Sequence, residues 1–283
     1  MYVPELVRKE GLRRGLRNET IRTYTVCLAK FFRVCRKDPR CITQRDILAY
    51  IDWLGEWGKS GSTLNVHFNA LRFFYEQVLR KSLTVHLQPP RVRKRLPEFL
   101  TQEEVVRLFA AIENEKHKLI IKLLYATGMR VSELVKLKVH DFQFDHNYGW
   151  IRDGKGGKDR LFVVAQKLKS ELQEWIHLHH LDYESWLFSG LGKHHISSHT
   201  IRLIVKRATQ KAKILKNVHP HTLRHSFATH LLENGYALTD VQPLLGHSKM
   251  ETTMIYAPLA RPKLLNVKSP LDGLQETLKW KKD

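Results

Sequence analysis

The chain has 283 residues, with 48 lysines and arginines against 28 aspartates and glutamates, a formal net charge of +20 at pH 7. Its hydrophobic content of 42% is enough for buried cores and excludes a disordered basic tail. No apolar run approaches the roughly 18 residues of a membrane span, and no signal peptide is apparent, so we expect a cytoplasmic protein. Such a charge indicates a polyanionic partner, either nucleic acid or an anionic membrane surface.

Residues 1–86 carry helical apolar patterns and predict a small bundle. Thr43-Gln-Arg-Asp46 has the spacing of a capping box and is expected to open a helix. Beside a later apolar stripe lie Asn65, Asn69 and Arg72, spaced so that they share one face of a helix. That polar face either enters a DNA groove or is simply solvated.

Residues 87–97 differ from both flanks, because they contain three prolines and four basic residues. The prolines disfavour helix and predict an extended connector. Its basic residues either follow a phosphate backbone or belong to an ordinary solvated linker. These residues are Arg91, Arg93, Lys94 and Arg95. Residues 1–96 hold 20 Lys+Arg and 8 Asp+Glu, and residues 97–283 hold 28 and 20, so two basic domains are expected to meet the polyanion.

After the linker, Thr101-Gln-Glu-Glu104 is a second capping box that leads into a helix. Residues 148–152 and 160–164 read as short strands, and the glycine-rich segment 153–159 between them predicts a β-hairpin. Further helical patterns cover residues 166–177, 198–211, 222–233, 239–245 and 249–259. We therefore predict a mainly α fold with a small antiparallel β-sheet, in which a helical bundle precedes an α+β domain.

Five motifs follow one another in the second half of the chain. They are Ala126-Thr-Gly-Met-Arg-Val-Ser-Glu-Leu134, Gly154-Lys-Gly-Gly157, His219-Pro-His-Thr-Leu-Arg-His-Ser-Phe-Ala-Thr-His230, Leu245-Gly-His247 and Tyr256. In this order they resemble the tyrosine site-specific recombinases, which include the Xer recombinases and phage-type integrases. The resemblance covers nearly the whole chain.

The resemblance implies a domain organisation. A SAM-like core-binding domain is expected at residues 1–86, a basic proline-rich linker at 87–97 and a catalytic domain at 98–262. The two domains would form a C-shaped clamp on DNA. The tail at 263–283 would dock on a neighbouring protomer, or alternatively pack on its own domain.

The resemblance also assigns the site residue by residue. The matching residues are Arg130, Glu133, Lys155, His221, Arg224, His247 and Tyr256. Arg130 corresponds to the family's first arginine, Glu133 to its acidic helper, Lys155 to its hairpin lysine and Tyr256 to its nucleophile. One departure is that Tyr256 is followed by Ala-Pro, where family members often have Thr-His.

The chemistry of these residue types agrees with the assignment. Attack of the Tyr256 hydroxyl on a DNA phosphate gives a covalent 3′-phosphotyrosyl intermediate and a free 5′ hydroxyl, so the ester is kept for rejoining. Arg130 and Arg224 suit a bidentate clamp on the phosphate. Lys155 can protonate the leaving oxygen, and His221 can accept the proton of the tyrosine.

His247 and Glu133 complete the set as supporting groups. His247 is interpreted as a donor to a phosphate oxygen, just before a helix that Ser248-Lys-Met-Glu251 is expected to cap. Glu133 lies three residues after Arg130, so one helical turn brings the two together and Glu133 is expected to hold the guanidinium.

We therefore predict a DNA recombinase for integration, excision or resolution, acting on double-stranded DNA as a homo-oligomer, with a tetramer implied by the resemblance. A type IB topoisomerase-like enzyme and a non-catalytic DNA-binding relative are the alternatives. Transesterification conserves the bond, so we expect no cofactor. His221 and His225 are four residues apart, but no HExxH motif or nearby cysteine accompanies them, so we expect no metal.

Overall fold

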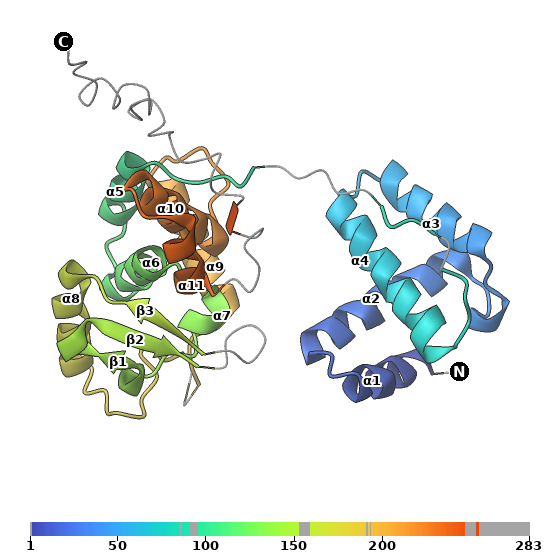
Figure 1. Ribbon diagram of the computed structural model, residues 1–283, viewed down its shortest axis with the longest axis horizontal. Coiled ribbons are helices and arrows are strands. Elements are labelled where there is room, and N and C mark those ends of the chain that lie inside the picture. The colour runs from blue at the N-terminus through green and yellow to red at the C-terminus, as the bar shows by residue number, and fades with distance from the viewer. Residues whose placement is uncertain are drawn as a thin grey trace, which may run out of the picture. The chain divides into compact units, whose positions relative to one another are not determined.

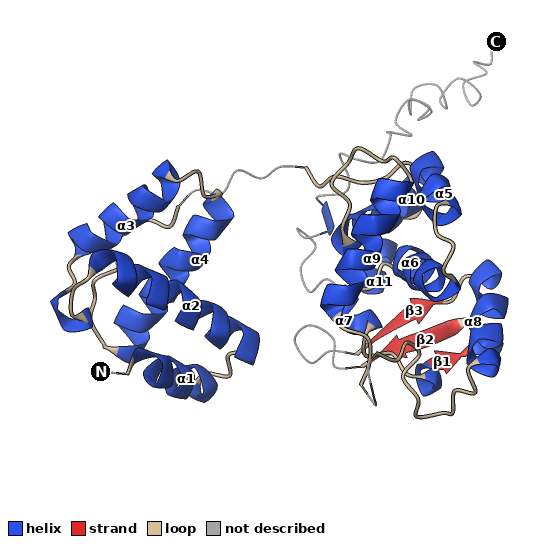
Figure 2. Ribbon diagram, turned by 180° about the vertical axis from the view of Figure 1, so that it is seen from behind, coloured by secondary structure: helices blue, strands red, loops and turns tan. Residues whose placement is uncertain are grey.

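The computed structural model describes residues 2–84, 87–90, 96–152, 159–190, 192, 194–246 and 253–254. The chain divides into two compact units, Met1–Arg95 and Leu96–Asp283 (Figure 1). Helices dominate both units, and one small sheet lies in the second (Figure 2). This agrees with the fold class expected from the sequence. No helix in these described ranges is long and apolar enough to cross a membrane.

The first unit is a bundle of helices. They are α1 (Val3–Arg13), α2 (Asn18–Cys35), α3 (Gln44–Glu56) and α4 (Gly61–Arg72), which continues into a π-helical segment, Phe73–Val78; a short 3-10 turn, Pro39–Cys41, precedes α3. The predicted capping box of α3 is confirmed, because Thr43 and Asp46 bond reciprocally to each other's backbone N–H. A reciprocal cap of this kind satisfies two donors that a helix start otherwise leaves without partners.

Aromatic side chains fill the core of the first unit. Phe31, Tyr50 and Phe74 are almost completely buried. The Phe31 and Tyr50 rings meet edge to face with centroids 5.0 Å apart, a favoured arrangement for aromatic pairs. α1 approaches α2 closely at Gly11, where a Cβ would come within 2.7 Å of Ile21 Cγ1. A side chain at position 11 would therefore require the Ile21 side chain to shift.

The second unit is built from seven helices in its described part and a three-stranded sheet. The helices are α5 (Gln102–Ala110), α6 (Glu115–Thr127), α7 (Val131–Leu134), α8 (Gln166–Leu178), α9 (Ser198–Lys211), α10 (Pro220–Glu233) and α11 (Leu238–Leu245). The predicted capping box of α5 is confirmed by reciprocal bonds between Thr101 and Glu104.

The sheet has the order β1-β2-β3 and is antiparallel throughout, with strands β1 (Phe142–Gln143), β2 (Tyr148–Ile151) and β3 (Arg160–Val163). The two predicted hairpin strands are confirmed, and Ile151 lies opposite Arg160 in their register. The buried residues of β3 are Arg160 and Phe162, whereas Leu161 and Val163 face outward. An arginine therefore occupies an inward position of the sheet.

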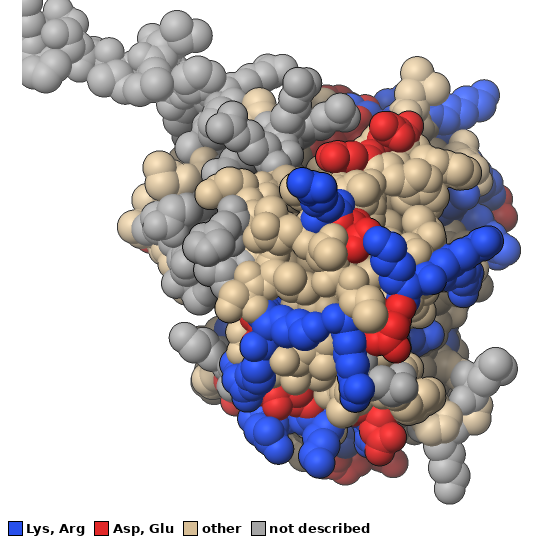
Figure 3. Space-filling model, turned by 90° about the vertical axis from the view of Figure 1, so that its right-hand side faces the viewer, with Lys and Arg blue, Asp and Glu red and all other residues tan. Residues whose placement is uncertain are grey.

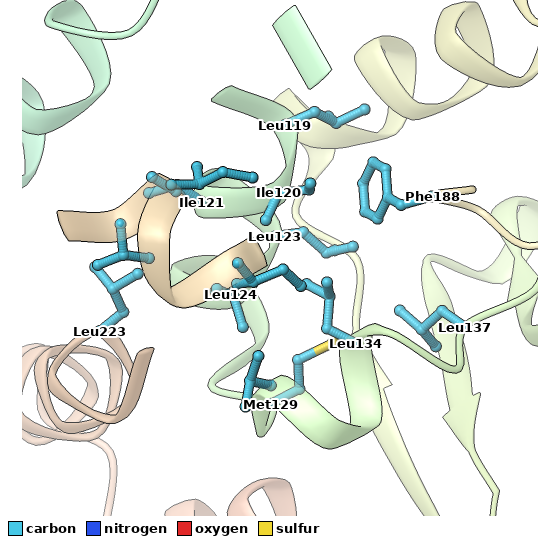
Figure 4. Packing of buried hydrophobic residues seen from close by; sticks show 14 of the residues in the cluster. Leu119, Ile120, Ile121, Leu123, Leu124, Met129, Leu134, Leu137, Phe188 and Leu223 are labelled. Carbon is cyan, nitrogen blue, oxygen red and sulfur yellow. The ribbon is translucent and has the colours of Figure 1, made fainter. Parts of the chain in front are cut away.

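The core of the second unit centres on α6, whose leucines and isoleucines are buried on several sides (Figure 4). Leu124 lies near Met129 and Leu134 of the segment that follows α6, and Leu223 of α10 belongs to the same cluster (Figure 4). This packing fixes the end of α6, the start of α7 and α10 against one another. It therefore positions the loop that carries Arg130.

Candidate active site

The residues assigned as first arginine and acidic helper meet at the start of α7. α6 ends at Thr127, and Gly128 then turns the chain with a left-handed φ of 58°. Glu133 accepts two hydrogen bonds from Arg130, one from its backbone N–H at 2.8 Å and one from Nη1 at 2.6 Å. These bonds hold both the backbone and the guanidinium of Arg130, whose side chain keeps 17% of its surface exposed.

Gly128 has a second reason to be glycine besides its φ. A Cβ at this position would lie 2.3 Å from Phe227 Cδ1, a distance that real side chains do not adopt. Phe227 belongs to α10, so the absence of a side chain at Gly128 lets α10 lie directly against the end of α6. That close approach brings the next functional residue, Arg224, to the same loop.

Arg224 is buried, with only 3% of its surface exposed. Its Nη1 donates to the Gly128 carbonyl at 2.7 Å and its Nη2 to the Leu245 carbonyl at 2.5 Å. The guanidinium thus joins the end of α6 to the end of α11. Because Gly128 comes two residues before Arg130, both arginines of the expected clamp are anchored at one short stretch of chain.

Three histidines lie on the first turns of α10. His219 caps the helix, because its Nδ1 accepts from the Thr222 N–H at 3.1 Å. The surrounding protein desolvates His221, and together with the positive charge of Arg224 this lowers its pKa below the usual 6.5 although its ring reaches solvent. Burial, followed by the neighbouring histidines, lowers the pKa of His225 to about 4. His221 and His225 are therefore neutral at neutral pH, and a neutral imidazole can accept a proton.

The structure adds one residue that the sequence analysis missed. Arg160, the first residue of β3, is 8% exposed. Its Nη2 donates to Glu133 Oε2 at 2.8 Å, and its Nη1 donates to the Leu244 carbonyl. The only signal in the sequence is the spacing of Arg160 from Phe162. Residues two apart on a strand point to the same face of the sheet, so an apolar Phe162 on the buried face places Arg160 there too.

Glu133 is consequently shared by two arginines. Burial would raise its pKa, but the charge of Arg160 and the hydrogen bonds from Arg130 and Arg160 outweigh burial and lower that pKa. The carboxylate is ionised at neutral pH and holds both guanidiniums. One buried acid therefore couples the Arg130 loop to the first residue of β3.

Several predicted site residues lie outside the described residues. They are Lys155, His247 and Tyr256 of the catalytic set and Arg91, Arg93, Lys94 and Arg95 of the linker. Described elements border the first two: β3 begins five residues after Lys155, and α11 ends two residues before His247. Of the catalytic set, the structure brings together Arg130, Glu133 and Arg224, and places His221 three residues before Arg224 on α10.

The polar stripe predicted in the N-terminal bundle lies on α4. Asn69 Nδ2 donates to Asn65 Oδ1 at 3.3 Å, and Arg72 Nε donates to Glu76 at 3.2 Å. The two asparagines are half-buried, whereas the Arg72 side chain is 56% exposed. The three residues share a face as expected, and the ion pair of Arg72 offsets part of its charge.

Figure 3 looks onto the first unit, where lysine and arginine side chains are spread over the surface with acidic side chains between them. Exposed basic residues of α2 include Arg22 and Arg33. Within the described ranges, no group of three or more histidine, cysteine, aspartate or glutamate side chains could hold a metal ion.

Two family models match this sequence. The model of the phage integrase family covers residues 98–262, and that of the phage integrase N-terminal SAM-like domain covers residues 5–85. The chain belongs to the phage integrase family. As a tyrosine recombinase it is an enzyme of the class that cleaves and rejoins DNA strands.

Relatives of this recombinase align over most of its length. It is 36% identical to tyrosine recombinase XerA of Pyrococcus horikoshii, covering 88% of this chain and 86% of the relative. It is 33% identical to tyrosine recombinase XerD of Oceanobacillus iheyensis, covering 89% and 92%. These matches do not favour the alternatives of a topoisomerase-like enzyme or a non-catalytic DNA-binding protein.

A solved structure also resembles this recombinase. The XerH site-specific recombinase, bound to a palindromic difH substrate in a post-cleavage complex, superposes with a TM-score of 0.73 and 25% identity. The match covers 92% of this chain and 82% of the XerH chain. The similarity therefore spans both units and not the second unit alone.

Proposed function

We propose that this recombinase cuts and rejoins double-stranded DNA at a specific site, using Tyr256 as nucleophile and Arg130 and Arg224 as the clamp on the scissile phosphate. The observation that carries the proposal is the common anchoring of the two guanidiniums. Arg224 donates to the carbonyl of Gly128, two residues before Arg130, and Glu133, three residues after Arg130, accepts from the Arg130 guanidinium. Preorganised guanidiniums stabilise the charge that develops on a phosphate without reorganising during the reaction.

The reaction follows as a transesterification. The Tyr256 oxygen bonds to phosphorus as the bond from phosphorus to the 5′ oxygen breaks. The tyrosine proton passes to His221, whose lowered pKa keeps it neutral and able to accept it. Lys155 supplies a proton to the departing 5′ oxygen, and His247 donates to a phosphate oxygen. Reversal of the same steps with another 5′ hydroxyl rejoins the strand.

The charge distribution supports a duplex partner held by both units. Residues 1–96 and 97–283 each carry an excess of basic residues, and phosphate contacts supply much of the affinity of proteins for DNA. In this proposal residues 1–86 are the core-binding domain and 98–262 the catalytic domain. The α4 stripe of Asn65, Asn69 and Arg72 and the basic residues of the linker contact the duplex.

The proposed assembly is a tetramer on two recombination sites. The XerH structure holds a palindromic substrate, and a site with two-fold symmetry is matched by two protomers. Exchange between two such sites then requires four protomers. Residues 263–283 are proposed to dock on a neighbouring protomer.

The experiment that tests this function captures the covalent intermediate on genomic DNA, so that the protein itself selects its site. The purified protein is incubated with sheared and randomly nicked genomic DNA of its host, so that a short strand released beside a cleaved phosphate leaves and rejoining is prevented. The protein is then denatured, and the DNA that stays attached is sequenced. We expect adducts at one sequence with the protein on a 3′ phosphate, and none from Tyr256→Phe. The control is Tyr236→Phe, which alters an exposed tyrosine after α10 and should behave as the unaltered protein. Adducts from Tyr256→Phe, or none from the unaltered protein, would contradict the mechanism.

A further inference from the structure

Arg160 is a buried cation that pairs within its own domain. Its side chain has 7% of its surface exposed, so it is closed off from a DNA backbone. Removing a guanidinium from water is costly unless it is paired and bonded. Its hydrogen bonds run to the Glu133 carboxylate and the Leu244 carbonyl, and both acceptors lie beside groups of the proposed reaction.

The first acceptor connects Arg160 to Arg130. Glu133 Oε2 receives both the Arg160 Nη2 at 2.8 Å and the Arg130 backbone N–H at 2.8 Å, while Oε1 receives the Arg130 Nη1. The carboxylate cannot rotate toward one arginine without loosening the other. Loss of Arg160 would leave Glu133 buried with one cation fewer, and its hold on the Arg130 guanidinium would weaken.

The second acceptor connects Arg160 to the end of α11. The carbonyls of Leu244 and Leu245 are consecutive acceptors there, the first for Arg160 and the second for Arg224. Cations at a helix C-terminus satisfy carbonyls that the helix itself leaves free. Gly246 follows with a φ of 61°, and a Cβ there would lie 2.6 Å from Arg160 Cδ. The chain thus passes directly over Arg160 before it reaches His247.

We propose that Arg160 is a positioning residue of the strand-cleavage reaction, which holds Arg130 through Glu133 and sets the end of α11 relative to it. The inference rests on the proposed function, in which Arg130 clamps the scissile phosphate. Arg160 itself touches no substrate. Its contribution reaches the phosphate through the orientation of Arg130, and misplacing such a group by about 1 Å costs roughly 10²-fold in rate.

The first test measures single-turnover formation of the covalent adduct on a nicked duplex that carries the site recovered by genomic capture. We expect Arg160→Met to react roughly 10- to 100-fold more slowly at saturating DNA, with unchanged duplex affinity. Arg160→Lys keeps a positive charge beside Glu133 and should recover part of the rate. If both variants cleave as fast as the unaltered protein, the inference is wrong.

A matched control separates positioning from general stability. Lys216 bonds a carboxylate, Glu104 at 2.6 Å, and a main-chain carbonyl, Phe99 at 2.9 Å, as Arg160 does. Its contacts lie on α5 and the segment before it. Lys216→Met should lower the melting temperature yet cleave within about twofold of the unaltered protein. If it loses as much cleavage as Arg160→Met, the role of Arg160 is only structural.

The second test asks which reacting group Arg160 serves. A methylphosphonate at the scissile position lacks one of the charged oxygens, so it depends less on the Arg130 guanidinium. The rate ratio between unaltered protein and Arg160→Met should shrink on that substrate. A 5′-bridging phosphorothiolate leaves as a thiolate, which needs no proton from Lys155, and there the full ratio should persist.

The rate ratios on the two substrate analogues test the role of Arg160, and adduct formation by the unaltered protein tests the proposed function. An equal ratio on the methylphosphonate, or a ratio that disappears on the phosphorothiolate, overturns the route through Arg130. Should Arg160→Met fail to fold, the same comparisons with Arg160→Lys decide. Absence of any adduct from the unaltered protein would instead contradict the proposed function.

Discussion

The Arg224 guanidinium donates to the carbonyl of Gly128, across 96 residues of sequence, at 2.7 Å. This bond ties α10 to the loop that presents Arg130. A second bond, to Leu245, ties the same guanidinium to the end of α11. The geometry of the proposed clamp therefore depends on a planar group that reaches two acceptors at once.

Arg224→Lys should abolish this double anchoring, because a lysine ammonium is a compact point charge without the fork of a guanidinium. We expect single-turnover cleavage to fall by about 10²–10³-fold, as for loss of one preorganised donor. Affinity for the duplex should change little. Adduct formation on a nicked substrate measures the cleavage rate, and a gel-shift titration measures the affinity for the duplex. Cleavage within threefold of the unaltered protein would show that the two carbonyl bonds do not set the reaction geometry.

Glu133→Gln should destabilise the second unit, because it removes the anion that two arginines share. Removing one partner of a buried ion pair lowers the free energy of unfolding by about 3–5 kcal/mol. Urea unfolding of the two proteins measures this difference. The pKa of Glu133 is lowered from its usual 4.5, so its stabilisation is present above that pH and is lost as pH falls through the folded value. The difference between the two proteins should therefore shrink on acidification. A difference that is constant from pH 7 to pH 3 would contradict this.

The pH dependence of the cleavage rate should follow the protonation of His221. Desolvation and Arg224 lower its pKa below 6.5, so the neutral, proton-accepting form persists at mildly acidic pH. We expect the single-turnover rate to be flat from pH 8 to about 6.5 and to fall only below that. His221→Gln should lower the rate and remove this acid limb. A rate that already declines between pH 8 and pH 7 on acidification would argue against His221 as the base.

Gly128→Ala should be harmful for two reasons that a control can separate. The left-handed φ strains any side chain, and the new Cβ would meet Phe227 at 2.3 Å. Gly15→Ala has a similar φ of 68° but nothing within 4 Å of the Cβ. We expect Gly15→Ala to cost about 1 kcal/mol and Gly128→Ala a further 1–3 kcal/mol from overpacking, by urea unfolding. Equal losses would mean that Phe227 moves aside freely.

Local signals predicted local structure well. The capping boxes at Thr43 and Thr101 are confirmed because a cap involves four consecutive residues and little else. The hairpin strands are likewise confirmed by their register. The close approach of α1 to α2 could not be predicted in this way, because the contact of Gly11 with Ile21 joins two segments and the periodicity of one segment does not contain it.

In the candidate site, too, contacts within one segment could be predicted and contacts between distant segments could not. The contact of Arg130 with Glu133 was expected because the two are one turn apart. The contacts of Arg224 with Gly128 and of Arg160 with Leu244 join residues 96 and 84 positions apart in the sequence, and no pattern within one segment indicates them. The role of Arg160 could not be predicted from the sequence, because only the completed sheet shows that it faces inward with Phe162.

The acceptors that hold Arg160 and Arg224 at α11 and α6 are main-chain oxygens, those of Leu244, Leu245 and Gly128. Replacing a side chain cannot delete a carbonyl, so point substitutions at Leu244 should leave the anchoring in place. Changes to the path of the backbone, in contrast, would move these carbonyl oxygens. A one-residue insertion or deletion near the end of α11 would carry the oxygens away from both guanidiniums together. This part of the enzyme is therefore robust to exchange of residue type and vulnerable to a change in chain length.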